Sequence, residues 1–421
     1  MPKKIDPRTA PRIAHYFRDV DLRGKSRPEY EPEAFPFHCR PDDDQWSSGF
    51  LLRVAVRFQH LWATYGVREG ERTIQGPQPA VCFSSFNLAD LIAVRDGFLP
   101  LDKAASQFAI TIPVRLAMKG GIEPFAHSSH EDTGHLPVAP LKQNAGTGAQ
   151  SQLQCPGAVC GLPSWPQGQP EWRWLYTGDY GRRIDRLLSH GIESGSIPGL
   201  KITWKKWTGI GVVVPDMVTA RALQYDLITL IDRGVVSKEH FDHVLVCDKL
   251  PSDVEGFDED SWRAAFHKAC FDFKSCMTVS RMDAVVTRLD FESRVLISEA
   301  SMPKGPVNEH GGCWLWFKDN THWYVRELIS EGRVKVNQRG RYLASLDELD
   351  PRRDLRERQN IALKLSQELR DKFGIRSSYF SVLNSQSPDD MPTYSGESWG
   401  GGYYITGTPE DEEEWCPVVA G

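Results

Sequence analysis

The alternation of apolar and polar positions predicts a series of short strands separated by helices. The best-defined strand is Pro79–Phe86, an apolar run that contains two hydroxyl side chains, Ser84 and Ser85, near its end. Asn87 follows at the position of a helix N-cap, so we expect a helical turn to begin at Leu88. Other apolar runs predict strands at 35–40, 108–114, 170–176, 208–214, 241–247 and 311–317.

Apolar residues at helical spacing predict the helices between these strands. These helices are expected at 12–20, 48–65, 88–94, 218–230, 323–331 and 355–373. Residues 208–247 run strand, helix, strand, which indicates one β-α-β unit. Residues 285–297 alternate as a strand does, and residues 301–309 form a linker that contains Pro and Gly. The fold class expected from this pattern is α+β, with a mixed-sheet domain followed by a smaller α+β domain.

The same pattern divides the chain into parts with different composition. They are an N-terminal arm at 1–34, a first domain at 35–300, a C-terminal domain at 310–405 and an acidic tail at 406–421. The first domain contains a polar loop, 127–169, and a loop of this length in a compact domain is usually functional or mobile.

Composition and charge exclude some classes of protein. The 421 residues carry a net charge of −6, so the chain has no global positive field for non-specific nucleic-acid binding. No run approaches the roughly 20 apolar residues of a membrane helix, and the polar start has no secretory signal. The nine cysteines are scattered, which is typical of reduced thiols, so we expect a cytoplasmic protein. Thirteen tryptophans predict aromatic-lined pockets or interfaces.

The chain contains no strong catalytic or nucleotide-binding motif. Three histidines and two acidic residues cluster between His127 and His135, and they form either a metal site or, as we favour, a solvated loop. His240 and His243 flank Asp242 beside an apolar strand, which favours a position at the edge of the core.

Three segments place polar groups near the end of an apolar or aromatic run: Phe37-His38-Cys39-Arg40, Val81-Cys82-Phe83-Ser84 and Pro170-Glu171-Trp172-Arg173. A cationic group, a hydroxyl and a carboxylate that converge on one cleft suit a glycosidic reaction. In nicotinamide transfer from NAD, the carboxylate would hold a ribose hydroxyl and offset the oxocarbenium charge. The expected catalytic residues are Glu171, His38 and Ser84, and the expected cofactor-binding residues are Arg40, Phe83, Ser85 and Trp172.

Each catalytic candidate also has a structural interpretation. Ser84 could cap the helical turn that follows it, and His38 could be a hydrogen-bonded strand histidine. Glu171 could form an ion pair at the surface with Arg173 or Arg182, and such a pair contributes little to stability.

The order His-x-Arg, Val-Cys-Phe-Ser and Glu-Trp-Arg, over roughly residues 35–250, resembles bacterial proteins associated with abortive infection and phage defence. The resemblance implies an ADP-ribosyltransferase-like fold, NAD as the substrate and a defence or toxin role. The related segment often has a second acidic residue two positions before the glutamate, where this chain has Gln169, so only Glu171 is left for the acidic role. Residues 311–405 resemble an uncharacterised bacterial domain for which no activity is implied.

The alternative function is a binding or regulatory protein that recognises nucleic acid or a partner protein. Basic and aromatic residues would form its surface: Lys201, Trp204, Lys205, Lys206, Trp207, Arg333, Lys335, Arg339, Arg341 and Tyr342. Lys205 and Lys206 are the expected nucleic-acid contacts. The expected partners are a macromolecular acceptor and a defence-system protein, with no membrane.

Overall fold

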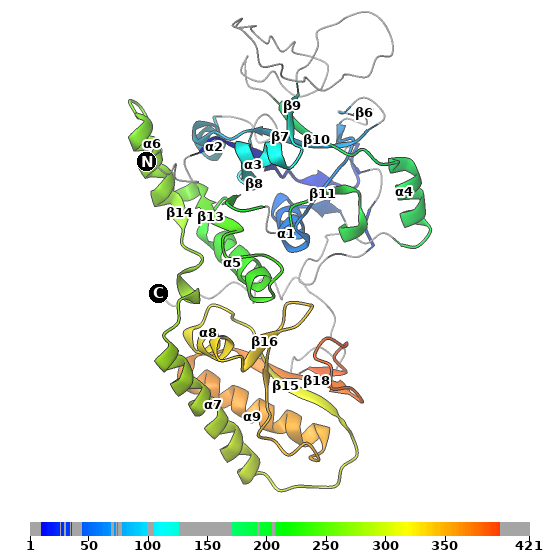
Figure 1. Cartoon of the computed structure of the whole chain (residues 1–421), viewed down its shortest axis with the longest axis vertical. Helices are drawn as coiled ribbons and strands as arrows, with labels where there is room; N and C mark the ends of the chain where they lie inside the picture. Colours follow the sequence, from blue (N-terminus) through cyan, green and yellow to red (C-terminus); the bar gives the residue numbers. More distant parts are fainter. Residues whose placement is uncertain are drawn as a thin grey trace, which may run out of the picture. The chain divides into compact units, whose positions relative to one another are not determined.

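A computed structural model describes residues 10–25, 27–28, 31–33, 35, 44–68, 71–72, 74, 78–98, 105–125, 171–191, 194–203 and 207–395. The protein is an α+β chain that forms two compact units, and Figure 1 labels their helices and strands. The first unit comprises residues 1–220 and 236–271, and the second comprises 221–235 and 272–421. Over the described ranges, no helix is both long enough and apolar enough to span a bilayer.

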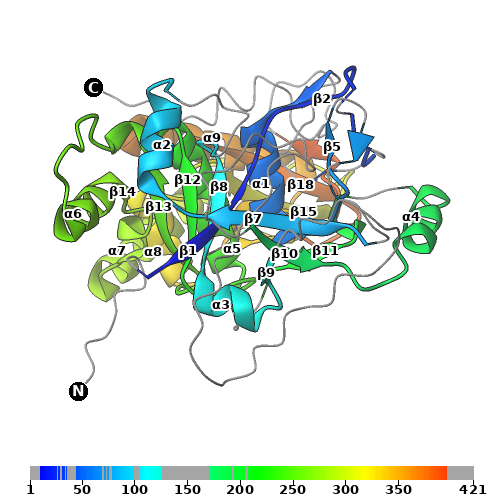
Figure 2. The ribbon, with the colours of Figure 1, turned by 90° about the horizontal axis from the view of Figure 1, so that it is seen from above.

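The first unit contains an eight-stranded sheet with the order β14-β13-β12-β8-β1-β7-β10-β9. Figure 2 shows β1 between β7 and β8, although these strands are far apart in the sequence. The strands are β1 (Arg12–Tyr16), β7 (Ala80–Ser85), β8 (Ala109–Pro113), β9 (Glu123–Phe125), β10 (Glu171–Leu175), β12 (Ile210–Val214), β13 (Phe241–Val246) and β14 (Cys270–Phe271). Among the strands that the structure describes in this sheet, only β12 and β13 pair in parallel. Helix α5 (Met217–Asp232) joins them, which confirms the predicted β-α-β unit.

Smaller elements complete the first unit. Three two-stranded sheets pair β2 (Val20–Asp21) with β3 (Gln45–Trp46), β4 (His60–Trp62) with β11 (Gly199–Lys201), and β5 (Val67–Arg68) with β6 (Glu71–Arg72). The helices are α1 (Ser48–Phe58), α2 (Leu88–Arg95), α3 (Val114–Lys119), α4 (Tyr180–Leu188) and α6 (Glu259–Ala269).

Local sequence signals place several of these elements. The predicted strand at Pro79–Phe86 is β7, and the helix after it is α2. Asn87 caps α2, because its side chain accepts a hydrogen bond of 2.9 Å from the Ala89 amide. Such a cap contributes roughly 1 kcal/mol. The prediction of a strand, an N-cap and a helix in this order is confirmed.

Helices α2 and α6 cover one face of the large sheet, which we call the α2 face. Residues directly opposite one another on paired strands share a face. Ala14, Ala109, Val213 and Leu245 lie on the α2 face, where they pack with side chains of both helices. Along each of these strands, residues two positions from these four therefore also point to the α2 face.

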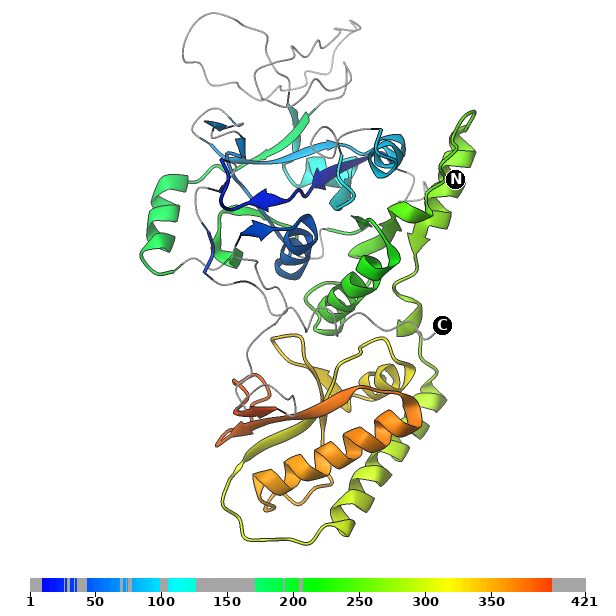
Figure 3. The ribbon, with the colours of Figure 1, turned by 180° about the vertical axis from the view of Figure 1, so that it is seen from behind.

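The second unit contains a five-stranded antiparallel sheet with the order β16-β17-β15-β18-β19. Figure 3 shows α7 and α9 side by side, and α9 also packs on β15 and β18. The elements are α7 (Arg281–Ser301), β15 (Gly311–Phe317), α8 (Trp323–Ser330), β16 (Val334–Val336), β17 (Tyr342–Ser345), α9 (Leu355–Phe373), β18 (Ser377–Leu383) and β19 (Tyr394–Ser395). The predicted strand 311–317 and helix 355–373 are confirmed with the same bounds.

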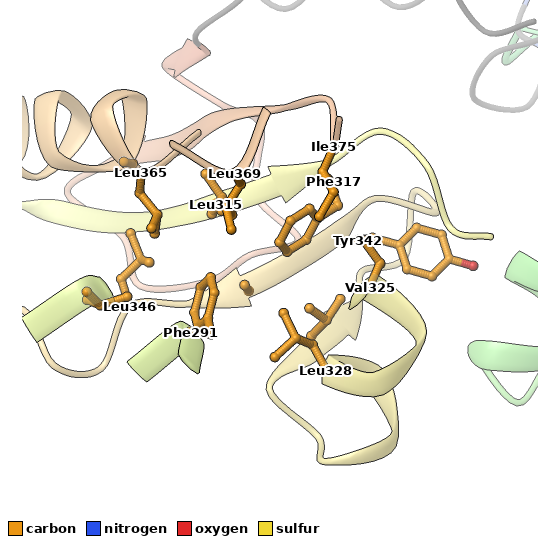
Figure 4. Packing of buried hydrophobic residues seen from close by; sticks show 14 of the residues in the cluster. Phe291, Leu315, Phe317, Val325, Leu328, Tyr342, Leu346, Leu365, Leu369 and Ile375 are labelled. Carbon is orange, nitrogen blue, oxygen red and sulfur yellow. The ribbon is translucent and has the colours of Figure 1, made fainter. Parts of the chain in front are cut away.

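The core of the second unit forms between the sheet and its helices. Figure 4 shows Leu369 of α9 close to Leu315 and Phe317 of β15, with Phe291 of α7 in the same cluster. All four side chains are fully buried. Full burial of such a side chain contributes about 1.5–3 kcal/mol.

Two predicted elements are wrong, and a third is shorter than expected. The expected helix at 12–20 contains β1, an inner strand of the large sheet, so residues 1–34 are not simply an arm. The expected strand within 285–297 lies in α7, a helix of 21 residues. The apolar residues of 285–297 alternate with polar ones as in a strand because helix α7 carries apolar side chains on two opposite faces. The expected helix at 48–65 ends at Phe58 and gives way to β4.

The boundary between the units also differs from the expected linker at 301–309. The second unit begins at residue 272 and takes in α7, because α7 packs against α8 and α9. It also includes residues 221–235 of the β-α-β segment. Most of the strand expected at 35–40 lies outside the described residues, and so does the acidic tail.

Candidate active site

Ser84 lies near the end of β7 and is half-buried. It pairs with Ala14 of β1, which points to the α2 face, so Ser84 points to that face as well. The amide of Ala89 is capped by Asn87, and the interpretation of Ser84 as the cap of this helix is therefore wrong.

Glu171 is the first residue of β10, which runs antiparallel to β7. The register pairs Trp172 with Phe83, so Glu171 comes next to Ser84 at the same end of the two strands. Directly opposite residues in such a pair have Cβ atoms about 4.5–5.5 Å apart. Sheet pairing thus brings a hydroxyl and a carboxylate from distant parts of the sequence side by side.

The Glu171 carboxylate binds Arg173 through two hydrogen bonds, from Nε at 3.0 Å and from Nη2 at 3.1 Å. Only 10% of the Glu171 side chain and 8% of the Arg173 side chain are exposed. The guanidinium also lies over the ring of Phe125, at 3.9 Å from its centroid. The ion pair that the sequence suggested is therefore present but shielded from solvent, and it holds the carboxylate in one position.

Arg12 of β1 supplies a cationic group on the same face. Its guanidinium donates to the Thr111 hydroxyl at 3.0 Å, to the Thr111 carbonyl at 3.1 Å and to the Gly209 carbonyl. Burial lowers the pKa of Arg12 to about 10, although the negative charge of Asp242 opposes this shift. Arg12 is still a cation at neutral pH, and its hydrogen bonds fix it in place.

Arg12, Ser84 and Glu171 belong to the neighbouring strands β1, β7 and β10, and we call this group the rim site. Arg12 is two residues from Ala14, so it shares the α2 face with Ser84. The Cα atoms of Arg12 and Ser84 are diagonal neighbours, about 7–8 Å apart. The Arg12 guanidinium reaches towards β8 and Gly209, on the side of β1 away from Ser84. Sequence reasoning missed Arg12 because it lies in the segment that was expected to be an arm.

The alternation of side chains along β7 and β10 divides the predicted residues between two faces. Phe83, Ser85 and Trp172 point away from the rim site. Phe83 has 1% of its surface exposed and Trp172 has 9%, so both are core residues. The expectation that they bind the cofactor placed them on the same side as Glu171, whereas the sheet places them on the opposite face.

His15, a second residue missed by the sequence, lies on this opposite face. Its Nδ1 is 2.9 Å from the Cys82 carbonyl, which can only accept, so Nδ1 carries the proton and Nε2 is the acceptor. The ring contacts the edges of Phe17 and Phe83. Burial lowers the pKa of His15 from its ordinary value, although the carbonyl opposes this shift, so the imidazole is neutral. His15 follows Ala14 in β1 and therefore points to the face of the sheet opposite Glu171.

Four predicted site residues lie outside the described residues: His38, Arg40, Lys205 and Lys206. The histidine-containing loop at 127–169 also lies outside them. In the described ranges, no cluster of His, Cys, Asp or Glu side chains could hold a metal ion.

His240 and His243 are both buried, as expected for residues at the edge of the core. His243 Nδ1 is 3.1 Å from the Asp242 carboxylate, and its ring packs edge-on against Phe266.

Some residues expected at the surface of the alternative function are buried, whereas Lys201, Lys335 and Arg339 are exposed. Arg341 and Tyr342 are fully buried, and Arg333 is buried beside Asp347 and Glu348. Because they are buried, Arg341 and Tyr342 cannot contact a nucleic acid.

Comparison with known proteins gives one match. Residues 277–401 match a family described as "Protein of unknown function (DUF4427)". No curated protein and no solved structure gives a significant match to the chain. The matched stretch lies in the second unit and includes α7, in agreement with a unit boundary that precedes this helix. The family description states no activity.

Proposed function

We propose that the first unit, as an ADP-ribosyltransferase-like domain, binds NAD and breaks its nicotinamide–ribose bond, with transfer of ADP-ribose to a macromolecular acceptor or to water. The observation that carries the proposal is the rim site, where Arg12, Ser84 and Glu171 lie on one face at one end of three adjacent strands. A cation, a hydroxyl and a carboxylate are the groups that this reaction requires. The resemblance noted in the sequence supports the same chemistry.

In this reaction the bond between ribose C1′ and the nicotinamide nitrogen breaks, and its electron pair leaves with neutral nicotinamide. Positive charge develops on the ribose as an oxocarbenium ion. The Glu171 carboxylate stabilises that charge and accepts a hydrogen bond from a ribose hydroxyl. The acceptor oxygen or nitrogen then bonds to C1′ and releases its proton to solvent.

Arg173 and Arg12 have supporting roles in this proposal. Arg173 orients the Glu171 carboxylate, since it binds both carboxylate oxygens. Arg12 contributes positive charge, which attracts the pyrophosphate of NAD. Ser84 hydrogen-bonds the ribose. The proposed biological role is a bacterial defence or toxin activity, through loss of NAD or modification of the acceptor.

The test is release of nicotinamide from NAD by the full chain, with and without cell extract as a source of acceptor. Glu171→Gln keeps the size of the side chain and removes its charge, and it should lower kcat about 100-fold or more. KM should change less, because the contact strengthens in the transition state.

Arg173→Gln is the matched control, because it breaks the same ion pair and keeps the carboxylate. A structural role for the pair predicts equal losses of stability and of turnover in both variants. The proposed role predicts a much larger loss of turnover in Glu171→Gln at a similar loss of stability. Absence of nicotinamide release by the wild type under both conditions would refute the proposal.

A further inference from the structure

Helix α7 is apolar on two opposite faces. One face packs into the core of the second unit, where Phe291 and Val295 are fully buried. The other face carries exposed apolar side chains: Met282, Val286, Leu289, Leu296 and Ile297, with 50–72% of their surface exposed. Single exposed apolar residues are ordinary, but a contiguous row of them on one helix face indicates an interaction surface.

The exposed row follows the spacing of a coiled-coil seam. Its positions are Met282, Val286, Leu289, Ser293, Leu296 and Ala300, all of them exposed. The steps between them alternate between four and three residues, which is the a/d pattern of a heptad repeat. The seam covers nearly the whole helix, a length of about 30 Å at 1.5 Å per residue.

The seam has the same spacing when it is read backwards, which makes it complementary to itself. We propose that α7 pairs antiparallel with α7 of a second copy of this chain, about a two-fold axis at the level of Phe291. In this register Met282 faces Ala300 of the second copy, Leu289 faces Ser293 and Val286 faces Leu296. A large residue meets a small one in the Met282–Ala300 and Leu289–Ser293 layers, and both copies contribute the same surface, as in an isologous interface.

A parallel pairing fits less well. Ser293 and Ala300 would each face their own copy and leave gaps, which the large side chains Met282 and Leu289, facing their own copies in other layers, could not fill. Large and small side chains at facing positions pack best when they alternate. The gaps at Ser293 and Ala300 therefore favour the antiparallel arrangement.

The charges beside the seam are compatible with this pairing. Near the axis, Asp290 and Glu292 each come close to their own counterpart in the second copy. Both carboxylates are already paired within their own helix, Asp290 with Arg294 at 2.8 Å and Glu292 with Arg288 at 2.7 Å. These arginines reduce the repulsion between the like charges.

The first test is sedimentation of the full chain over a concentration series. The wild type should pass from monomer to dimer within a series that covers the micromolar range. Leu289→Glu should weaken the dimer about 100-fold or more, because it puts two charges into the central layers. The matched control is Leu188→Glu on α4, where the leucine is 61% exposed, and it should leave the dimer intact. Both variants change exposed positions, and their circular dichroism should match the wild type.

The second test is the orientation of the helices. Leu289→Cys and Ser293→Cys chains, mixed and oxidised, should form a disulfide between residues 289 and 293 of different copies, which peptide mapping identifies. A wild type that is monomeric throughout the series would overturn the proposal, as would a dimer that Leu289→Glu does not affect. A dominant link between two residues 289 would overturn the antiparallel register.

Discussion

The ion pair between Asp232 and Arg326 offers the most direct test of what holds the second unit together. The Arg326 guanidinium contacts both carboxylate oxygens, at 2.5 and 3.0 Å, and Tyr342 donates its hydroxyl to the same carboxylate at 2.9 Å. The two paired side chains are only 5% and 6% exposed. Burial opposes the charge of Arg326, yet the hydrogen bond and the charge of Asp232 raise the pKa of the guanidinium above its ordinary value.

We predict that Asp232→Asn destabilises the second unit by about 3–5 kcal/mol, because a buried guanidinium loses its counter-charge. The whole stability of a domain is about 5–15 kcal/mol, so this loss is large. The double variant Asp232→Asn with Arg326→Met should recover part of the loss, since neither side chain then leaves an uncompensated charge. As a control, Lys304→Gln breaks the exposed pair with Asp350 and should leave stability unchanged.

The assay combines urea denaturation with hydrogen exchange of the amides in α8 and β17. Exchange locates the loss of stability, which must lie in the elements that carry Arg326 and Tyr342. A loss below about 1 kcal/mol would refute the reasoning, because it would equal that of a surface pair. A double variant as unstable as the sum of the two single variants would also refute it, since the two residues would then be independent.

Two further predictions concern buried groups of the first unit. Burial lowers the pKa of His60 and of His240 from 6.5 to about 4, so as the pH falls the unfolded chain binds protons at these residues before the folded chain does. The stability that the two neutral histidines contribute should be full above pH 6.5 and should fall as the pH drops towards 4, by up to roughly 3 kcal/mol for each residue. Urea midpoints measured across this range should show a shallower slope for His240→Gln, and an unchanged slope would contradict the assignment. Gly211→Ala would place a Cβ 2.1 Å from His243 Nε2 and should destabilise by about 1–3 kcal/mol, whereas Gly181→Ala in α4, where there is room, should stabilise by about 0.5–1 kcal/mol. Equal urea midpoints for the two variants would show that the space around Gly211 is not limiting.

The sequence by itself determined the elements whose signals are local. Asn87 marks the start of α2 because an N-cap needs only a side-chain oxygen and an amide two residues ahead. Helix α9 was predicted with its bounds from the spacing of its apolar residues, and in the structure Asp354 caps its start and Gly374, at φ 72°, ends it. Local chemistry of this kind does not depend on the rest of the fold.

Tertiary structure decided the features that depend on which strands pair. Glu171 and Ser84 come side by side only through the register of β7 with β10. Arg12 can be buried because Thr111 and Gly209, distant in sequence, accept its hydrogen bonds, and no local pattern encodes those partners. The sequence of α7 was misread for a related reason: its two apolar faces resemble a strand until packing shows that one face lines the core and the other is exposed.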